Sequence, residues 1–141
     1  MEKFIFPKFP FHHWNKNIII VIKNNYLSVS VSGHFSLSDA KIMYADALEC
    51  LLKNDLSILF FDAFKVKGKI TTMNRYYFGE FAALESLKYM IKGLKKITVS
   101  ICGKEPIIDP QRFGEIVARN RGLNLKVTTD KNESLQFLGV E

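Results

Sequence analysis

Residues 97–138 read ITVSIC (97–102), DPQRFGEIVARNRG (109–122), LKVT (125–128) and DKNESLQFL (130–138). Short apolar segments, typical of strands, alternate here with amphipathic segments of helical length. Asp109 with Pro110 predicts the start of a helix, because aspartate caps free N–H groups and proline fits the first helical position. Gly122 predicts the end of that helix, and Asp130 with Glu133 forms a capping box for the next one. The stretch therefore predicts a β-α-β-α unit of a layered α/β domain.

The same alternation can be followed back to residue 18. The expected elements are, in chain order, strands at 18–23 and 26–35, a helix from Ser36 to about Asn54, a strand at 57–61, a helix from Thr71 or Thr72 to Lys92, a strand at 97–102, a helix from Asp109 to Gly122, a strand at 125–128 and a helix from Asp130 to Leu138. A tight turn at Asn24-Asn25 makes the first two strands an antiparallel hairpin. The sequence therefore predicts one α/β domain with a five-stranded mixed sheet.

Side-chain alternation indicates how the helices lie on this sheet. In the second strand Leu27, Val29 and Val31 alternate with serines, and the last two strands alternate in the same way. A strand covered on one face should alternate, so we expect the helices mainly on one face. In the helix that begins at Thr71 or Thr72, the residues expected on the inward face are Met73, Tyr77, Phe81, Leu84, Leu87 and Ile91. The absence of Gly-x-Gly-x-x-Gly after the first strand argues against a dinucleotide-binding sheet.

Residues 1–17 differ in composition from the domain at 18–141. Aromatic residues alternate there with Pro7, Pro10 and basic residues, which predicts an extended arm rather than a helix. The strands at 18–22 and 58–61 are apolar on both sides, so the open sheet face needs a cover. We expect this arm, or the arm of a second subunit in a homodimer, to supply it.

Composition narrows the class of protein. The 141-residue chain has a net charge of +6, but its basic residues are scattered among acidic ones, and it has no nucleic-acid-binding motif. Its longest apolar runs are too short to span a bilayer. Cys50 and Cys102 are interpreted as buried thiols in a reducing compartment. We therefore expect a cytoplasmic protein that neither inserts into membranes nor binds nucleic acid.

Two expected helices share a polar pattern, Arg-Tyr-Tyr-Phe-Gly-Glu at 75–80 and Arg-Phe-Gly-Glu at 112–115. Glycine inside a helix costs about 1 kcal/mol relative to alanine, so the two glycines indicate close packing of these helices. Arg112 and Glu115 are then expected to form an exposed ion pair. The alternative is a pocket for an anionic ligand, with a polar rim formed by Arg75, Glu80, Arg112 and Glu115.

Signs of enzyme chemistry are few. The three histidines do not have the spacing of metal ligands, so we expect neither a metal nor another cofactor. Asp62 is placed at the carboxyl end of a central strand, where α/β folds carry functional groups, but it has no identifiable base or nucleophile as a partner. Glu80 and Glu115 would form an acid/base pair only if their helices brought them together. A noncatalytic protein is therefore expected.

The stretch from Glu105 to Glu115 with Arg119-Asn120-Arg121-Gly122, together with the element order of 18–138, resembles the STAS-like proteins. These are related in fold to bacterial anti-sigma-factor antagonists and to the cytoplasmic domains of sulfate transporters. The resemblance implies a mixed sheet with helices mostly on one face and a role in protein regulation or small-ligand sensing. In the antagonists, a serine at the start of the helix after the third strand is phosphorylated, and that surface binds an anti-sigma kinase. The matching segment here is Asp62 to Thr72, where a longer Lys-rich loop replaces the Asp-Ser-Ser-Gly signature.

Three hypotheses about function follow from these features. The first is a noncatalytic STAS-like module that binds a protein partner, with a phosphorylation switch at Thr71 or Thr72. Phosphate is favoured at a helix N-terminus, and Lys65, Lys67 and Lys69 precede it, although an ordinary threonine N-cap accounts for the same residue. The second is a carrier or sensor of a small apolar or amphipathic ligand, indicated by 12 phenylalanines and 5 tyrosines. The third is an enzyme of unknown reaction, which needs a cleft that gathers Asp62, Arg75, Glu80 and Arg112.

Overall fold

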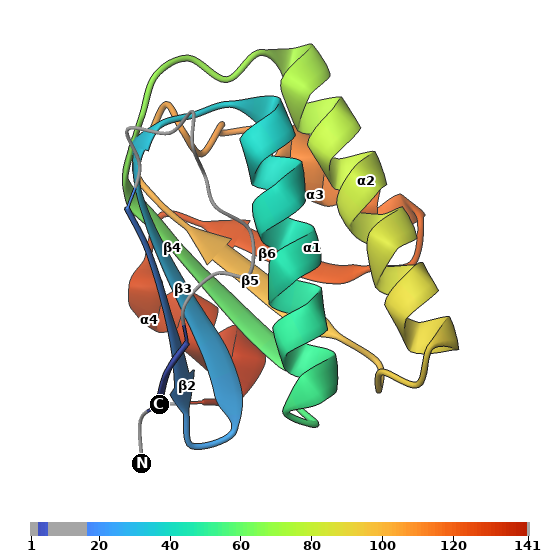
Figure 1. Cartoon of the computed structure of the whole chain (residues 1–141). Helices are drawn as coiled ribbons and strands as arrows, with labels where there is room; N and C mark the ends of the chain where they lie inside the picture. Colours follow the sequence, from blue (N-terminus) through green and yellow to red (C-terminus); the bar gives the residue numbers. More distant parts are fainter. Residues whose placement is uncertain (1–2, 6–16, 141) are drawn as a thin grey trace.

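The structure, a computed structural model, describes residues 3–5 and 17–140. Its elements are, in chain order, β1 (Lys3–Ile5), β2 (Asn17–Lys23), β3 (Tyr26–His34), α1 (Leu37–Lys53), β4 (Ile58–Lys67), α2 (Thr72–Ile91), β5 (Thr98–Cys102), α3 (Phe113–Asn120), β6 (Asn124–Thr128) and α4 (Lys131–Leu138). The strands form one sheet with helices packed on both of its faces (Figure 1).

The strands lie in the order β1-β2-β3-β4-β5-β6, with antiparallel pairing from β1 to β3 and parallel pairing from β3 to β6. The mixed sheet and its five predicted strands are confirmed. β1 adds an edge strand within the predicted arm, with Lys3 opposite Ile22. Residues 6–16 of that arm lie outside the described residues, so its cover of the open sheet face and its role in a homodimer remain predictions.

Helices α1, α2 and α3 lie on one face of the sheet, and α4 lies on the other (Figure 1). The main core lies between the sheet and the first three helices and includes Leu27, Leu48, Leu59, Phe61 and Val99. Helix α4 packs on β4, β5 and β6 over a second cluster that includes Tyr26, Phe60, Cys102 and Leu138. The helices are therefore mainly on one face, as expected. Residues 58–61 are apolar on both sides because Phe60 and Phe61 belong to different cores.

The helix starts confirm the predicted caps. Helices α1 and α4 begin after the N-caps Ser36 and Asp130. Thr71 is the N-cap of α2, where its Oγ1 accepts a hydrogen bond from the Asn74 N–H at 3.1 Å, and Thr72 is the first helical residue. Each cap satisfies an N–H group that has no partner within its own helix.

Strand β4 is longer than predicted. It continues to Lys67, well beyond the predicted end at Phe61, and the register of its pairing with β3 shifts just after Asp62. The Asp62 Oδ1 accepts a hydrogen bond from the Phe64 N–H at 3.1 Å, which stabilises the backbone at this β-bulge. The placement of Asp62 at the carboxyl end of a strand was therefore wrong, because the bulge lets the strand continue.

Helix α3 begins later than predicted, at Phe113 instead of Pro110. The preceding residue, Arg112, has a φ of 54°, and this left-handed backbone conformation interrupts a right-handed helix. Asp109 still satisfies the start of α3, because its Oδ2 accepts a hydrogen bond from the Phe113 N–H at 3.2 Å. The capping residue was thus identified correctly and the first helical residue was not.

The predicted inward face of α2 is also wrong. The residues of α2 that are buried are small ones, Gly79, Ala82, Ala83 and Ser86. Most of the large apolar residues assigned to the core are exposed, including Met73, Tyr77, Leu84, Leu87 and Ile91. Small side chains let α2 approach α1 and α3 closely. Because of this close approach, the buried face of α2 is the one that carries the small residues.

A buried hydrogen bond links α1 to this small-residue face of α2. The Tyr44 and Ser86 hydroxyl oxygens are 2.7 Å apart, and burial raises the pKa of Tyr44, so the phenol stays protonated. We expect Tyr44→Phe and Ser86→Ala each to lower the free energy of unfolding by about 1 kcal/mol, because each leaves one buried hydroxyl unpaired. The double variant should lose no more than either single variant in urea unfolding. Additive losses would contradict the pairing.

Candidate functional site

The N-terminus of α2 carries the two predicted phosphorylation candidates. Thr71 and Thr72 are both exposed, and so are Lys65, Lys67 and Lys69 in the segment that leads to them. Unpaired backbone N–H groups and the helix dipole make such a helix end favourable for negative charge. The structure thus places both threonines on the surface, at an electropositive end of α2.

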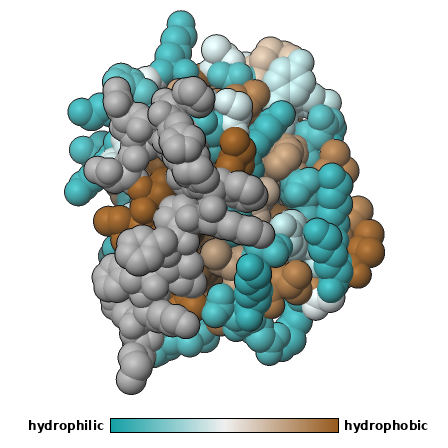
Figure 2. Space-filling view, viewed as in Figure 1, coloured by the Kyte–Doolittle hydropathy of each residue, from teal (hydrophilic) through white to brown (hydrophobic). Residues whose placement is uncertain are grey.

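A row of exposed apolar side chains follows along the outer face of α2. Its members, here called the α2 stripe, are Met73, Tyr77, Leu84, Leu87 and Ile91, and between 42% and 79% of each residue is exposed. Spacings of three, four and seven residues keep these side chains on one side of a helix. Apolar residues are visible in Figure 2 at the edge of the molecule where Figure 1 places α2.

A cavity of about 150 Å³ lies on the inner side of the same helix end. It is partly open to the surface and is lined by the sheet, the first turns of α1 and α2, and the segment that leads into α3. Three of the four predicted rim residues, Arg75, Arg112 and Glu115, line this cavity, whereas the fourth, Glu80, does not. Asp62, the other site candidate, does not line it either. The predicted polar rim is therefore only partly assembled.

Arg75 fixes the segment between β5 and α3. Its Nη1 donates to the Ile107 carbonyl at 2.7 Å, and its Nη2 donates to the carbonyls of Pro106 at 2.9 Å and Ile70 at 3.3 Å. Its Nη1 also lies 3.6 Å from the Asp109 Oδ1. Most of the donors of this guanidinium are therefore used within the chain, and its first role is to position the cavity wall.

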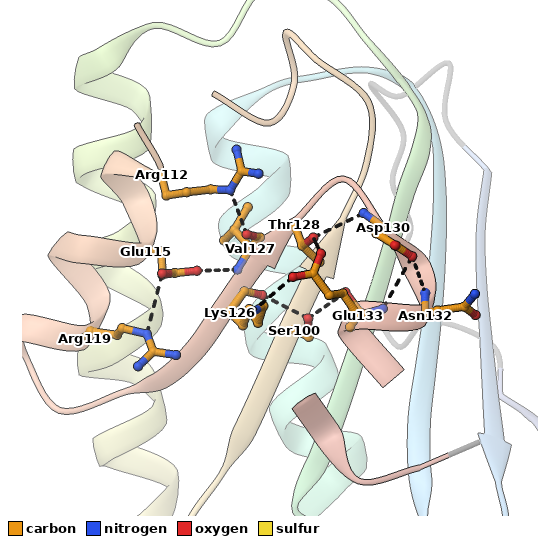
Figure 3. Close-up of polar contacts among 11 residues, drawn as sticks. Ser100, Arg112, Glu115, Arg119, Lys126, Val127, Thr128, Asp130, Asn132 and Glu133 are labelled. Atoms are coloured by element: carbon orange, nitrogen blue, oxygen red, sulfur yellow. Dashed lines mark hydrogen bonds and ion pairs between the residues drawn. The ribbon is translucent and has the colours of Figure 1, made fainter. Parts of the chain in front are cut away.

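Side chains from α3 and from its N-cap residue satisfy the free edge of β6, the last strand of the sheet (Figure 3). The Glu115 Oε1 accepts from the Val127 N–H at 2.6 Å, and the Arg112 Nε donates to the Val127 carbonyl at 2.9 Å. The Arg119 Nε donates to the Leu125 carbonyl at 2.6 Å. An unpaired strand edge invites pairing with other chains, and these contacts block it.

The predicted ion pair between Arg112 and Glu115 is not formed. Glu115 instead pairs with Arg119, with 3.7 Å between the Oε2 and the Nε. The Arg112 Nη1 donates to the Asp109 carbonyl at 2.5 Å. Both side chains reach opposite backbone groups of Val127, and this places them on the strand edge rather than against each other.

The other two predicted carboxylates lie apart from this group. The Glu80 Oε2 accepts from the Tyr76 hydroxyl at 3.3 Å and lies 3.4 Å from the Arg121 Nη2, on the exposed side between α2 and the end of α3. Glu80 and Glu115 therefore have separate partners and form no acid/base pair. Asp62 directly follows Phe61, whose side chain lies in the core between the sheet and helices α1 to α3. Because successive side chains of a strand point to opposite faces, the Asp62 side chain is directed to the face that α4 covers. The cleft that the enzyme hypothesis requires is not formed.

The two thiols are not reactive at neutral pH. Cys102 is buried and Cys50 is half-buried, so the expectation of two buried thiols holds fully only for Cys102. Burial raises the pKa of Cys102 to about 12 and that of Cys50 to about 11, so both stay protonated and poorly nucleophilic. The described residues also contain no group of three or more His, Cys, Asp or Glu arranged to hold a metal ion.

None of the helices in the described part of the chain has the length and apolar character needed to cross a bilayer. The element order, the mixed sheet and the placement of three helices on one face and one on the other define a STAS-like α/β fold.

Comparison with known proteins supports this assignment of the fold. The fold matches the crystal structure of an anti-sigma factor antagonist from Mycobacterium paratuberculosis with a TM-score of 0.53. The match covers 89% of this chain and 95% of that chain at 14% sequence identity. No protein-family model and no curated protein matches the sequence. A likeness at this identity shows the fold and leaves the function to be argued from the site.

Several residues that shape the site were missed in the sequence. Arg119 was named only within the motif that carries the resemblance, although it donates to the Leu125 carbonyl. Asp109 was assigned only to a cap, although it also pairs with Arg75. The exposed position of the α2 stripe was missed as well. A usable signal was the run of small residues on the opposite side of α2, because Gly79, Ala82 and Ser86 recur at helical spacing.

Proposed function

We propose that this chain is a noncatalytic regulatory module that binds a protein partner on the α2 stripe, and that phosphorylation of Thr71 or Thr72 controls this binding. The observation that carries the proposal is the α2 stripe itself. Exposed apolar side chains that gather on one face of a soluble protein are a typical feature of protein interaction sites. A helical face with anchors three, four and seven residues apart is also a recurrent recognition surface.

The fold comparison supports a regulatory partner. The neighbouring structure is that of an anti-sigma factor antagonist. By this analogy, the proposed partner is a regulatory protein of the anti-sigma factor class. The ion pair between Glu80 and Arg121 lies beside the α2 stripe and offers polar contacts within the same surface. Arginine and tyrosine are common among residues that dominate binding energy, and Arg121 and Tyr77 fit that role.

Phosphorylation at the start of α2 would weaken this binding. A phosphate adds about −2 charge at neutral pH, and Thr71 and Thr72 immediately precede Met73, the first residue of the α2 stripe. The helix N-terminus stabilises that charge in the free protein, whereas a partner seated on Met73 must remove water from it. The phosphate therefore favours the unbound state.

The interface is tested by capture of partners from extracts of the native cells. The purified protein is compared with the double variant Leu84→Glu/Leu87→Glu, whose substitutions lie on exposed positions of the α2 stripe. Ile19→Glu is the matched control, because Ile19 is 51% exposed and lies on β2 rather than on a helix. We expect one protein to be retained by the wild type and by Ile19→Glu and lost with the double variant. Equal capture by all three, or no capture by any, would overturn the proposal.

The switch is tested with the partner identified in that way. Thr71→Glu/Thr72→Glu should weaken its affinity at least tenfold, measured by isothermal titration calorimetry. Thr71→Ser should bind as the wild type does, because serine keeps the N-cap. Mass spectrometry of the protein from its native cells should find phosphate on one of these threonines. Its absence under every growth condition would remove the switch and leave the interface standing.

A further inference from the structure

The cavity behind the N-terminus of α2 has the position of a ligand site. It lies where the carboxyl ends of parallel strands β3 to β6 meet the N-terminal ends of α1, α2 and α3. Open α/β sheets bind ligands at this end of their strands, because loops and helix N-termini converge there. Its location thus differs from that of a packing defect in the middle of a core.

The walls of the cavity are suited to an apolar molecule. They include Met43, Phe61, Val66, Phe78, Ile101 and Ile108. The volume of about 150 Å³ has room for a molecule of the size of benzene. The body of a fitting ligand is therefore apolar and contains about six carbon atoms.

The cavity wall carries two arginines, Arg75 and Arg112, and two carboxylates, Asp109 and Glu115. Arg75 is paired with Asp109, and Glu115 is paired with Arg119. Arg112 has no carboxylate within ion-pair distance among the described residues, since its hydrogen bonds go to the carbonyls of Val127 and Asp109. Among the charged residues of this wall, Arg112 is therefore the cation that has no ion-pair partner in the described part of the chain.

Arg112 also retains hydrogen-bonding capacity. Its Nε and Nη1 have partners, whereas its Nη2 has none among the residues that the structure describes. Figure 3 shows the side chain extended from the start of α3 over Val127, with the terminal nitrogens directed away from that strand. The left-handed backbone at Arg112, with a φ of 54°, sets this direction at an energetic cost. A guanidinium with free donors beside an apolar cavity is suited to a carboxylate.

We propose that this cavity binds a small monocarboxylate, with its apolar body among the core side chains and its carboxylate on Arg112. This inference goes beyond the proposed function, because it needs neither a protein partner nor phosphorylation. Ile70 and Asn74 line the cavity on either side of Thr71, so a bound ligand would contact the segment that carries the proposed switch.

The test uses benzoate and its neutral analogue benzyl alcohol as probes for the full-length protein. Two-dimensional ¹H–¹⁵N NMR locates the binding, and calorimetry gives its strength. Arg112→Gln removes the charge, and Lys95→Gln removes a charge from an exposed residue outside the cavity. Ala40→Leu fills part of the cavity, because Ala40 is a buried residue of its wall.

Benzoate should cause saturable shifts at the cavity-lining amides and bind at least tenfold more tightly than benzyl alcohol. Arg112→Gln should remove that preference, Lys95→Gln should preserve it, and Ala40→Leu should abolish binding of both probes. Equal binding of the two probes by the wild type would overturn carboxylate recognition, and this comparison does not depend on any variant folding. Absence of saturable binding by either probe would overturn the site itself, without bearing on the α2 stripe.

Discussion

Arg75→Met should lower the free energy of unfolding by about 3 kcal/mol, the largest effect of any single substitution considered. The side chain is only 14% exposed, and it donates to three backbone carbonyls between Ile70 and Ile107 while lying 3.6 Å from the Asp109 carboxylate. Hydrogen bonds from a charged group contribute about 1.5–3 kcal/mol each, and their losses at one residue overlap. Methionine keeps much of the apolar length of the side chain and supplies none of the donors. Urea unfolding followed by circular dichroism measures the change.

Two further variants separate positioning by Arg75 from a general effect of charge. Lys88→Met also removes a cation from α2, but that side chain is 68% exposed and pairs only with Glu85, so we expect a change within about 0.5 kcal/mol. The loss of unfolding free energy in Arg75→Lys should lie between those of Arg75→Met and Lys88→Met. The lysine ammonium group keeps the ion pair with Asp109, but it cannot reach several carbonyls at once as the planar guanidinium does. If Arg75→Met lowered the free energy of unfolding as little as Lys88→Met does, the contacts of Arg75 would not be what holds the segment before α3.

Features set by neighbouring residues could be predicted from the sequence. Ser36, Asp130 and either Thr71 or Thr72 were expected to cap helices. Ser36, Thr71 and Asp130 do so, each through a residue no more than three positions away. The hairpin at residues 24–25 and the alternation of strands and helices depend on similarly short-range patterns. These interactions form within one turn or one strand, so the sequence contains all of their partners.

Features set by distant residues could not be predicted in the same way. The continuation of β4 past Asp62 depends on pairing with β3, about thirty residues earlier in the chain. The role of Arg112 depends on β6, because its partner, the Val127 carbonyl, lies 15 residues later in the chain. The hydrophobic pattern of α2 was misread because burial followed the close approach of neighbouring helices instead of side-chain size. Close approach is a property of the packed structure.

The candidate site, too, could be predicted from the sequence only in part. The repeated Arg and Glu pattern drew attention to Arg75, Arg112 and Glu115, and the structure places all three on the wall of one cavity. It wrongly added Glu80 to that rim, because the extra residues between Arg75 and Glu80 turn the glutamate to the outer side of α2. The same repeat correctly predicted the approach of the two helices at Gly79 and Gly114.

Gly79→Ala should destabilise the protein by about 2 kcal/mol, although alanine is the better helix former. A Cβ at position 79 would lie 2.7 Å from the Gly114 carbonyl oxygen and 3.2 Å from the Val117 Cβ. Overpacking costs about 1–3 kcal/mol, and a clash with backbone lies at the upper end because no side-chain rotation relieves it. The gain of about 1 kcal/mol in helix propensity offsets only part of this cost.

Gly114→Ala is the matched control, since it makes the same chemical change on the facing helix. A Cβ there would lie 3.4 Å from the Arg75 carbonyl oxygen, an ordinary contact, so we expect stability to stay within about 0.5 kcal/mol or to rise by up to about 1 kcal/mol. The changes in stability of the two variants, measured by thermal and urea unfolding, should therefore have opposite signs or differ strongly in size. Equal effects would mean that α2 and α3 do not approach each other through Gly79. The position of Arg75, four residues earlier on α2, would then need another explanation, because the same approach brings it to the segment before α3.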